Sequence, residues 1–153
     1  MERPDIEEVY RRQIKNIYRT ALVLLGNRED AEDVASEVFM KYLKKPRAFS
    51  DETHERNWFI AVTRNCCKDL WRTVWRRKTV LGDIPEMAIC PEEDRAVIEE
   101  VMSLPYKLRE VVYLHYYEGY TLREIAKITH TSESTLQSRV AKAREILKDL
   151  LSE

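Results

Sequence analysis

The chain has 153 residues and a mass of 18.2 kDa, enough for one ordinary domain or two very small ones, which excludes a large multidomain enzyme. Charged residues make up 35% and hydrophobic residues 44%, with three glycines and five prolines. This mixture supplies a core but few of the turns of a β-sandwich or barrel, so we expect an all-α protein. The net charge of -1 excludes a global attraction to DNA or anionic membranes, so DNA binding must come from local patches.

Neither a targeting segment nor a metal site is indicated. The amino terminus lacks an apolar segment of signal-peptide length, and the longest aliphatic run, 21–25, is too short to span a bilayer. We therefore expect a cytoplasmic protein with no membrane insertion. Cys66, Cys67 and Cys90 are odd in number and far from the three histidines, which favours reduced thiols over a zinc site. We expect no metal and no cofactor.

The first half of the chain predicts three helices. Apolar residues recur every three or four positions over 6–25, which is typical of an amphipathic helix, and a glycine follows. A second helix is expected over 29–44, because acids fill its first turn and lysines its last. The polar stretch 47–55 predicts a loop, and 57–78 contains no helix breaker, which predicts a long third helix.

A break in the middle of the chain predicts two domains. Residues 79–91 hold one glycine and two prolines and interrupt every helical pattern. We expect them to be a short linker between two small helical domains, 1–78 and 92–153. Further helices are predicted over 94–102 and 105–117, the latter opened by a proline.

The carboxy-terminal part carries a helix-turn-helix pattern. Thr121 and Glu124 match a capping box, and the helix that they open is followed by the polar break 129–132 and a second amphipathic helix. The face of this second helix that lacks core residues offers polar and basic side chains that suit base edges and phosphates. A helical hairpin with a merely solvated polar face is the alternative that this pattern leaves open.

The long third helix combines cations with aromatic rings. Arg64, Lys68, Arg72 and Arg76 recur every four residues, beside two tryptophans that are also four apart. Such a surface can hold phosphates and stack unpaired bases. A solvated basic face is the alternative, although soluble proteins seldom expose tryptophans without a use.

Both halves resemble one family. The run LPYKLREVVYLHYYEGYTLREIAKITHTSESTLQSRVAKAREIL, 104–147, resembles the promoter-reading carboxy-terminal domain of bacterial sigma factors. DAEDVASEVFMKYL and NWFIAVTRNCCKDLWRTVWRR, within 7–78, resemble the core-binding and promoter-melting segments of the same family. The order of the two matches across a short linker resembles the compact extracytoplasmic-function class. The second domain is therefore expected to have the sigma carboxy-terminal, winged-helix-like type of helix-turn-helix.

The resemblance implies a set of functional residues. A face that docks on core RNA polymerase would include Asp33, Ser36, Glu37, Phe39 and Met40. The upstream promoter element would be read by Ser132, Ser134, Gln137, Ser138, Arg139 and Lys142. The downstream element, with strand opening, would be contacted by Arg56, Trp58, Arg64, Asn65, Lys68, Asp69, Arg72, Trp75 and Arg76, and the 47–57 loop would capture an unstacked base.

Several positions depart from the family pattern, and His130 and Gln137 are two of them. His130 stands where the turn usually has glycine, so a left-handed conformation there is less comfortable. Gln137 stands where a basic residue is common, and a neutral amide suits adenine better than guanine.

The function predicted from these observations is that of a sigma factor, which recognises promoters, opens their strands and initiates transcription. The resemblance implies core RNA polymerase, promoter DNA and an anti-sigma factor as partners. A stand-alone helix-turn-helix regulator is the alternative, but it leaves the basic third helix and the acidic second helix unexplained. An enzyme built on His115, Glu118 or the Cys66-Cys67 pair lacks any spacing suited to catalysis, so we expect a protein that is not an enzyme.

Overall fold

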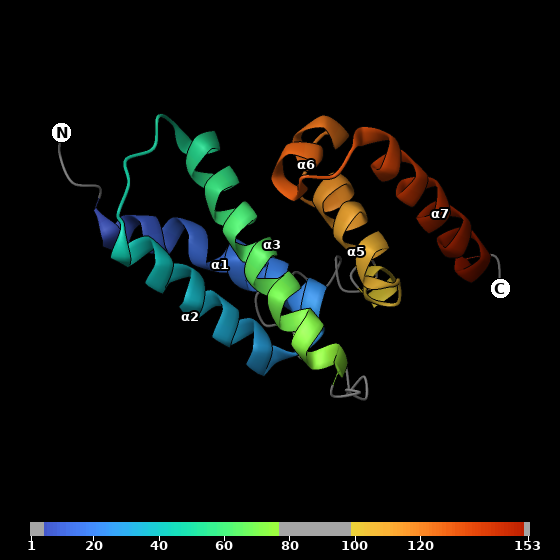
Figure 1. The fold of residues 1–153 in the computed structure, drawn as a ribbon, viewed down its shortest axis with the longest axis horizontal. Helices are drawn as coiled ribbons and strands as arrows, with labels where there is room; N and C mark the ends of the chain where they lie inside the picture. The colour runs from blue at the N-terminus through green and yellow to red at the C-terminus, as the bar shows by residue number, and fades with distance from the viewer. Residues whose placement is uncertain (1–4, 77–98, 152–153) are drawn as a thin grey trace. The chain divides into compact units, whose positions relative to one another are not determined.

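The computed structural model describes residues 5–76 and 99–151, and within these ranges the side chains of 74–76 and 149–151 lie outside the description. Every regular element in the described ranges is a helix, so the all-α class expected from the sequence is confirmed (Figure 1). The chain divides into two compact units, Met1–Ile89 and Cys90–Glu153. The linker predicted at 79–91 lies outside the described residues, as does most of the helix predicted at 94–102.

The first unit is a three-helix domain made of α1 (Ile6–Leu25), α2 (Arg28–Lys44) and α3 (Glu52–Arg76). Each of these helices packs on the other two (Figure 1). Asp5 caps the start of α1 by accepting from the backbone N–H groups of Glu7 and Glu8. Gly26 ends α1 in the left-handed region, at φ 69°, where a residue without a Cβ is favoured.

The core of this unit is aliphatic at one end and aromatic at the other. The aliphatic part comes from 21–25 of α1, together with Val34 and Val38 of α2. At the aromatic end Phe59 is fully buried and packs against Phe39 and Tyr42, with ring centroids 5.4 and 5.3 Å apart. These contacts hold α3 against α2 and fix where the segment between them begins and ends.

The start of α3 differs from the sequence prediction. The loop was expected over 47–55 and the helix from 57, but α3 begins at Glu52. Asp51 provides the missing signal, because its carboxylate accepts from the backbone N–H of His54 at 2.7 Å, which is the geometry of an N-terminal cap. The loop between α2 and α3 is therefore shorter than expected and covers 45–51.

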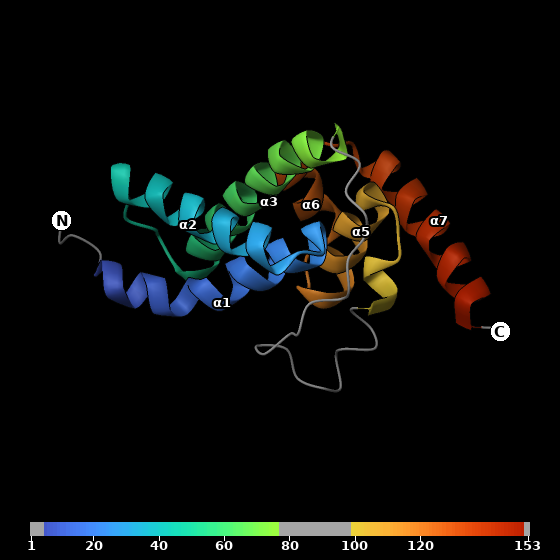
Figure 2. The same cartoon turned by 90° about the horizontal axis from the view of Figure 1, so that it is seen from below.

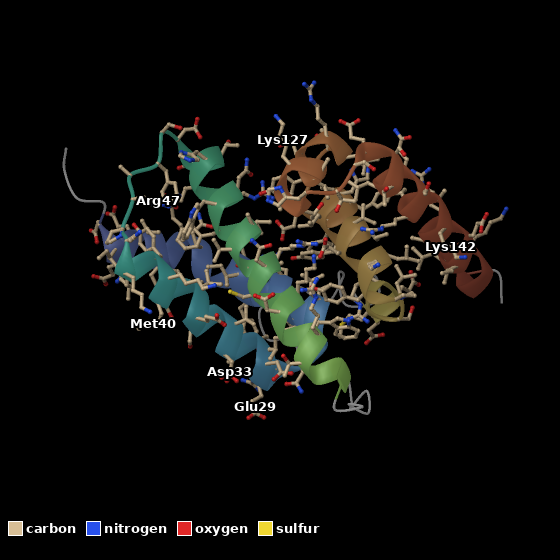
Figure 3. The ribbon with its side chains drawn as sticks, viewed as in Figure 1. Glu29, Asp33, Met40, Arg47, Lys127 and Lys142 are labelled. Carbon is tan, nitrogen blue, oxygen red and sulfur yellow. The ribbon has the colours of Figure 1, made fainter. Side chains whose placement is uncertain are left out.

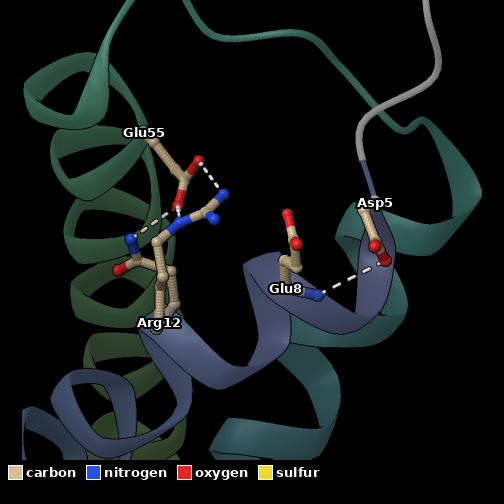
Figure 4. A network of polar contacts seen from close by, with 5 residues as sticks. Asp5, Glu8, Arg12 and Glu55 are labelled. Atoms are coloured by element: carbon tan, nitrogen blue, oxygen red, sulfur yellow. Dashed lines mark hydrogen bonds and ion pairs between the residues drawn. The ribbon is translucent and has the colours of Figure 1, made fainter.

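A buried carboxylate ties α1 to α3. Glu55, 6% exposed, accepts from Nε and Nη2 of Arg12, both at 3.0 Å, and from Nε2 of Gln13 at 2.8 Å (Figure 4). Burial alone raises the pKa of Glu55, but the hydrogen bonds from Arg12 and Gln13 and the charge of Arg12 outweigh it, so the pKa is lowered. The ionised form of this carboxylate therefore stabilises the first unit.

Replacing Glu55 by glutamine is expected to lower the unfolding free energy of the first unit by about 1–3 kcal/mol at neutral pH, since the partly exposed Arg12 loses a bidentate partner. Because the folded pKa is lowered, the wild-type contribution is complete above roughly pH 4.3 and is lost as the pH falls further, whereas Glu55→Gln lacks this acid-dependent loss. All three tryptophans lie in this unit, so urea unfolding followed by tryptophan fluorescence measures it.

The control for this prediction is Glu52→Gln, which changes an exposed carboxylate in the same turn of α3. We expect its unfolding free energy to stay within about 0.5 kcal/mol of wild type. Equal losses in the two variants would show that the Arg12–Glu55 pair adds nothing beyond the general charge of this helix end.

The second unit contains α5 (Tyr106–Val112), η1 (Tyr113–Tyr117), α6 (Leu122–Thr129) and α7 (Glu133–Leu151), after a helical stretch at 99–102 (Figure 2). α7 packs on α5 and α6, and η1 packs on α5 and α6. Leu114, Ile125 and Leu136, each at most 1% exposed, form the centre of the core, with Ala143 fully buried further along α7. The predicted helix-turn-helix is thus present as α6, a turn and α7.

The helix expected at 105–117 changes type in its second half. η1 is a π-helical turn, in which the backbone N–H of Glu118 donates to the carbonyl of Tyr113, five residues back, at 3.0 Å. The Tyr113 hydroxyl donates to Glu118 at 2.6 Å, and the ring of Tyr113 stacks on Tyr117 at 5.3 Å. These side-chain contacts join the two ends of the wider turn, whereas the periodicity of the sequence showed only a helix.

The turn between α6 and α7 adopts the predicted strained conformation. The capping box is confirmed, since Thr121 and Glu124 each satisfy the other's backbone N–H. His130 lies in the left-handed region, at φ 54° and ψ 40°, and its backbone N–H donates to the carbonyl of Ala126. The Ser132 hydroxyl accepts from the backbone N–H of Thr135 and so caps α7.

Replacing His130 by glycine is expected to stabilise the second unit by about 0.5–1 kcal/mol, because glycine adopts this conformation at no steric cost and only part of the gain is lost to the greater freedom of the unfolded chain. Hydrogen exchange of the α6 amides measures the effect. Lys127→Gly, at an exposed position inside α6, is the matched control and should destabilise by about 1 kcal/mol. Faster exchange in His130→Gly than in wild type would contradict this prediction.

Candidate functional site

The outer face of α2 is acidic and apolar. Asp33, Ser36 and Glu37 are exposed, and Met40 is 55% exposed. Figure 3 shows Glu29, Asp33 and Met40 along the outer edge of α2. Phe39, predicted for the same face, is only 7% exposed, because its ring packs between Tyr10 and Phe59. Four of the five residues predicted to bind polymerase therefore lie on one accessible surface, and the fifth lies beneath it.

A groove of about 560 Å³ runs beside this face, between α1 and α2. Its lining is mostly apolar and comes from Tyr10, Ile14, Tyr18, Ala35, Phe39 and Met40, with Lys15, Glu32 and Ser36 as polar members. Tyr10 is 47% exposed although its ring contacts Phe39 at 4.8 Å. The α1 side of this groove was not predicted, because its residues have the same spacing as the core residues of an ordinary amphipathic helix.

The loop between α2 and α3 is anchored by an aromatic ring. The ring centroid of Phe49 lies 5.9 Å from that of Trp58 on α3 and 6.3 Å from that of Tyr42 on α2. The middle of the loop is therefore anchored to both flanking helices. The guanidinium carbon of Arg47 lies 5.1 Å from the centre of the Trp58 ring, in cation–π contact. The loop thus presents a cation over a half-buried tryptophan, an arrangement that can receive a base or a phosphate.

The predicted residues on α3 are less uniform than a simple basic stripe. Asn65, Asp69 and Arg72 are exposed, and Arg56, Trp58 and Lys68 are half-buried. Arg64 is only 7% exposed and donates to Asn65 at 3.4 Å, so it is not the freely accessible cation that the four-residue spacing predicted. The side chains of Trp75 and Arg76 lie outside the described residues.

The face of α7 that is turned away from its core matches the sequence prediction closely. Ser134, Gln137, Ser138 and Lys142 are exposed, Arg139 is half-buried, and Leu136, Val140 and Ala143 fill the opposite face. Ser132 is exposed too, but its hydroxyl caps α7. Arg144, which is also exposed on α7, donates from Nε to the Tyr116 hydroxyl at 2.8 Å, and its guanidinium lies over the Tyr116 ring.

The groups considered for catalysis have structural contacts instead. Burial and the charge of Glu37 raise the pKa of Cys66, more than the nearby Lys41 lowers it, which favours the unreactive thiol. His115 Nδ1 donates to the Tyr120 carbonyl at 2.7 Å, and Glu118 accepts from Tyr113. In the described ranges, no three potential metal ligands form a cluster, and no helix has the length and apolar composition to cross a bilayer.

Two protein-family models match this chain, one in each unit. The model of sigma-70 region 2 matches residues 8–77, and that of sigma-70 region 4 matches residues 94–147. The ECF RNA polymerase sigma factor SigM of Bacillus subtilis is 27% identical over 154 residues, covering 95% of this chain and 94% of that protein. The chain belongs to the extracytoplasmic-function class of sigma factors.

Other comparisons agree with this family. The probable RNA polymerase sigma factor RfaY of Xanthomonas campestris is 26% identical over 149 residues, and the match spans 86% of the present sigma factor but 37% of RfaY. The sigma factor RpoE from Bartonella quintana, solved in complex with the anti-sigma factor NepR, aligns over 97% of both chains with 21% identity and a TM-score of 0.78. That likeness shows a shared fold.

Membership in this class establishes the general function. The sigma factor binds core RNA polymerase and directs promoter recognition in transcription initiation, and the stand-alone regulator is not favoured. Its family consists of non-catalytic initiation factors. Which residues make each contact stays a prediction, and the surfaces on α2, α3 and α7 are the candidates.

Proposed function

We propose that the two units divide promoter recognition between them, as the predicted domains 1–78 and 92–153 suggest, with 79–91 setting their separation. The first unit would dock on core polymerase and open the downstream element, and the second would read the upstream element. The observation that carries this proposal is the contrast between two accessible faces: α2 presents Asp33, Glu37 and Met40, whereas α7 presents Gln137, Ser138 and Lys142.

In this proposal the α2 face and its groove form the polymerase-binding surface. Exposed apolar side chains such as Met40 and Tyr10 would be buried on binding, which favours the complex. The carboxylates of Asp33 and Glu37 would favour a partner surface that is basic. An anti-sigma factor would cover the same surface and so hold the sigma factor inactive. RpoE, which shares this fold, was solved in complex with the anti-sigma factor NepR, and this supports an anti-sigma factor as a partner.

Strand opening would need no chemistry from the protein. Separating stacked bases costs a few kcal/mol per step, which a binding site for unpaired bases can repay. The loop 45–51, with Arg47 over Trp58 and Phe49 beneath, would receive a base of the opened strand, while Arg72 and Asn65 on α3 would contact its backbone. The sigma factor would therefore have no enzymatic activity, and would act in the bacterial cytoplasm with the polymerase.

Run-off transcription from randomised templates tests this proposal. The full-length sigma factor is combined with cognate core polymerase and a template pool in which the upstream region is randomised. We expect transcripts enriched for two short sequence elements at a fixed spacing, which core polymerase alone does not produce. Stable binding to core polymerase without any sequence enrichment would contradict the assignment of promoter reading to these surfaces.

A further inference from the structure

An exposed histidine in the first turn of α3 holds the loop that precedes it. The backbone N–H of Ser50 donates to Nδ1 of His54 at 3.1 Å, and the Ser50 hydroxyl lies 3.3 Å from the same nitrogen. In return, the backbone N–H of His54 donates to the carboxylate of Asp51 at 2.7 Å. The arrangement resembles a capping box in which an imidazole takes the place of glutamate and reaches one residue further back.

The same ring also packs against the aromatic anchor of the loop. The rings of His54 and Phe49 meet edge to face, with centroids 5.2 Å apart. Phe49 in turn contacts Trp58, over which Arg47 lies. His54 therefore contacts the loop through its backbone at Ser50 and through its core-facing side chain at Phe49.

We propose that His54, in its neutral form, is the positioning residue that keeps the 45–51 loop ready to receive an unpaired promoter base. This proposal rests on the base-capturing role assigned to the loop above. His54 would act through Ser50 and Phe49 without touching DNA itself.

Only one form of the ring fits these contacts. A backbone N–H can donate to Nδ1 only when that nitrogen carries no proton, so His54 must be neutral with its proton on Nε2. Protonation turns Nδ1 into a donor, which leaves the Ser50 N–H without this acceptor and places a positive charge at the positive end of the α3 dipole. The contacts that hold the loop therefore require the neutral ring.

The surrounding charges have mixed signs. The turn that carries His54 supplies the carboxylates of Asp51, Glu52 and Glu55, α1 supplies Glu8 and Arg12, and the loop supplies Arg47. Arg12 and Glu55 are paired with each other. The Asp51 carboxylate accepts from the backbone N–H of His54, a contact that does not involve the imidazole ring.

Three variants separate the hydrogen bond from the charge. His54→Asn keeps an acceptor near the position of Nδ1 but does not titrate, His54→Ala removes the acceptor, and Thr53→Ala changes an exposed neighbour in the same turn as a matched control. Amide hydrogen exchange and the ¹⁵N signals of the imidazole are measured by NMR on the 153-residue chain, at roughly pH 8.

At this pH we expect the wild-type ring in the Nε2–H form and the Ser50 amide protected from exchange. His54→Asn should keep that protection, and His54→Ala should lack it. A proton on Nδ1 of the neutral ring, or a Ser50 amide equally protected in His54→Ala, would overturn the contact and with it the proposal.

The second readout is open-complex formation, followed by permanganate reactivity of unpaired thymines on a template selected as above. We expect His54→Ala to lower it roughly five- to tenfold, as for one hydrogen bond of ordinary strength, and His54→Asn and Thr53→Ala to stay near wild type.

The two readouts fail in different ways. If wild type selects no promoter sequence, the proposed function is wrong, while NMR still decides whether His54 holds the loop. If wild type opens a promoter and His54→Ala opens it equally well, the function stands and the positioning role of His54 is refuted.

Discussion

Reversing two acids on α2, Asp33→Lys with Glu37→Lys, is expected to weaken binding to core polymerase by more than about tenfold. Both side chains are exposed on the proposed docking face, so their reversal replaces attraction to a basic partner by repulsion at short range. The fold should persist, because both side chains are exposed and the pair of Glu37 with Lys41, at 3.7 Å, lies at the surface, where such pairs contribute about 0.3–0.5 kcal/mol. Biolayer interferometry on immobilised cognate core polymerase measures the Kd.

The matched control changes net charge by the same amount on another element. Glu133→Lys with Glu145→Lys reverses two exposed acids of α7. Measured without DNA, this variant should keep a Kd within about twofold of wild type, because surface charges away from an interface act only through the screened field of the whole protein. Equal weakening by both pairs would mean that general charge, and not the α2 face, governs binding.

Replacing Gln137 by arginine is expected to change which base is preferred at one position of the upstream element. The Gln137 side chain is exposed on the outer face of α7, where it can pair with adenine through its amide. Arginine pairs with guanine at the same depth, and a bidentate contact discriminates by about 1–3 kcal/mol, or roughly five- to 150-fold. Selection from the randomised template pool should therefore shift from adenine to guanine at that position and nowhere else.

Lys142→Ala provides the contrast for this prediction. Lys142 lies on the same face but, as a flexible point charge, it suits a phosphate better than a base edge. Its removal should weaken binding to all templates alike and reduce the salt dependence by about one charge, with no change in the selected sequence. A uniform loss with unchanged preference in Gln137→Arg would place Gln137 outside the groove.

Local sequence signals sufficed where each element carries its own start and stop. The extent of α1 follows from its apolar spacing and from Gly26, and the capping box at Thr121 was readable directly. The start of α3 was missed because Asp51 stands in a stretch of polar residues in which several could serve as caps. Sequence periodicity also cannot distinguish an α-helix from the π turn at 113–117, since the difference is set by side-chain contacts such as Tyr113 with Glu118.

The candidate site was predictable as far as helix faces determine it. The outward face of α7 and the acids of α2 follow from the 3.6-residue period, and they are exposed as expected. Burial of Phe39 and Arg64 depends on which neighbours cover a face, which no single helix reveals. Two contacts could not be predicted from the sequence, that of Glu55 with Arg12 and that of His54 with Ser50. Both depend on α3 beginning at Glu52, earlier than the sequence indicated.

The π turn of η1 contains one residue more than an α-helical turn would. A π turn amounts to an α-helical turn with one residue inserted, so side chains beyond it are displaced around the axis by about 100° relative to an uninterrupted helix. With that displacement Tyr116 meets Arg144 across the fold, while Tyr113 remains in the core. Shortening the chain by one residue here would restore ordinary helical winding and carry Tyr116 away from Arg144, so the length of this segment, as much as its composition, determines whether this contact with α7 forms.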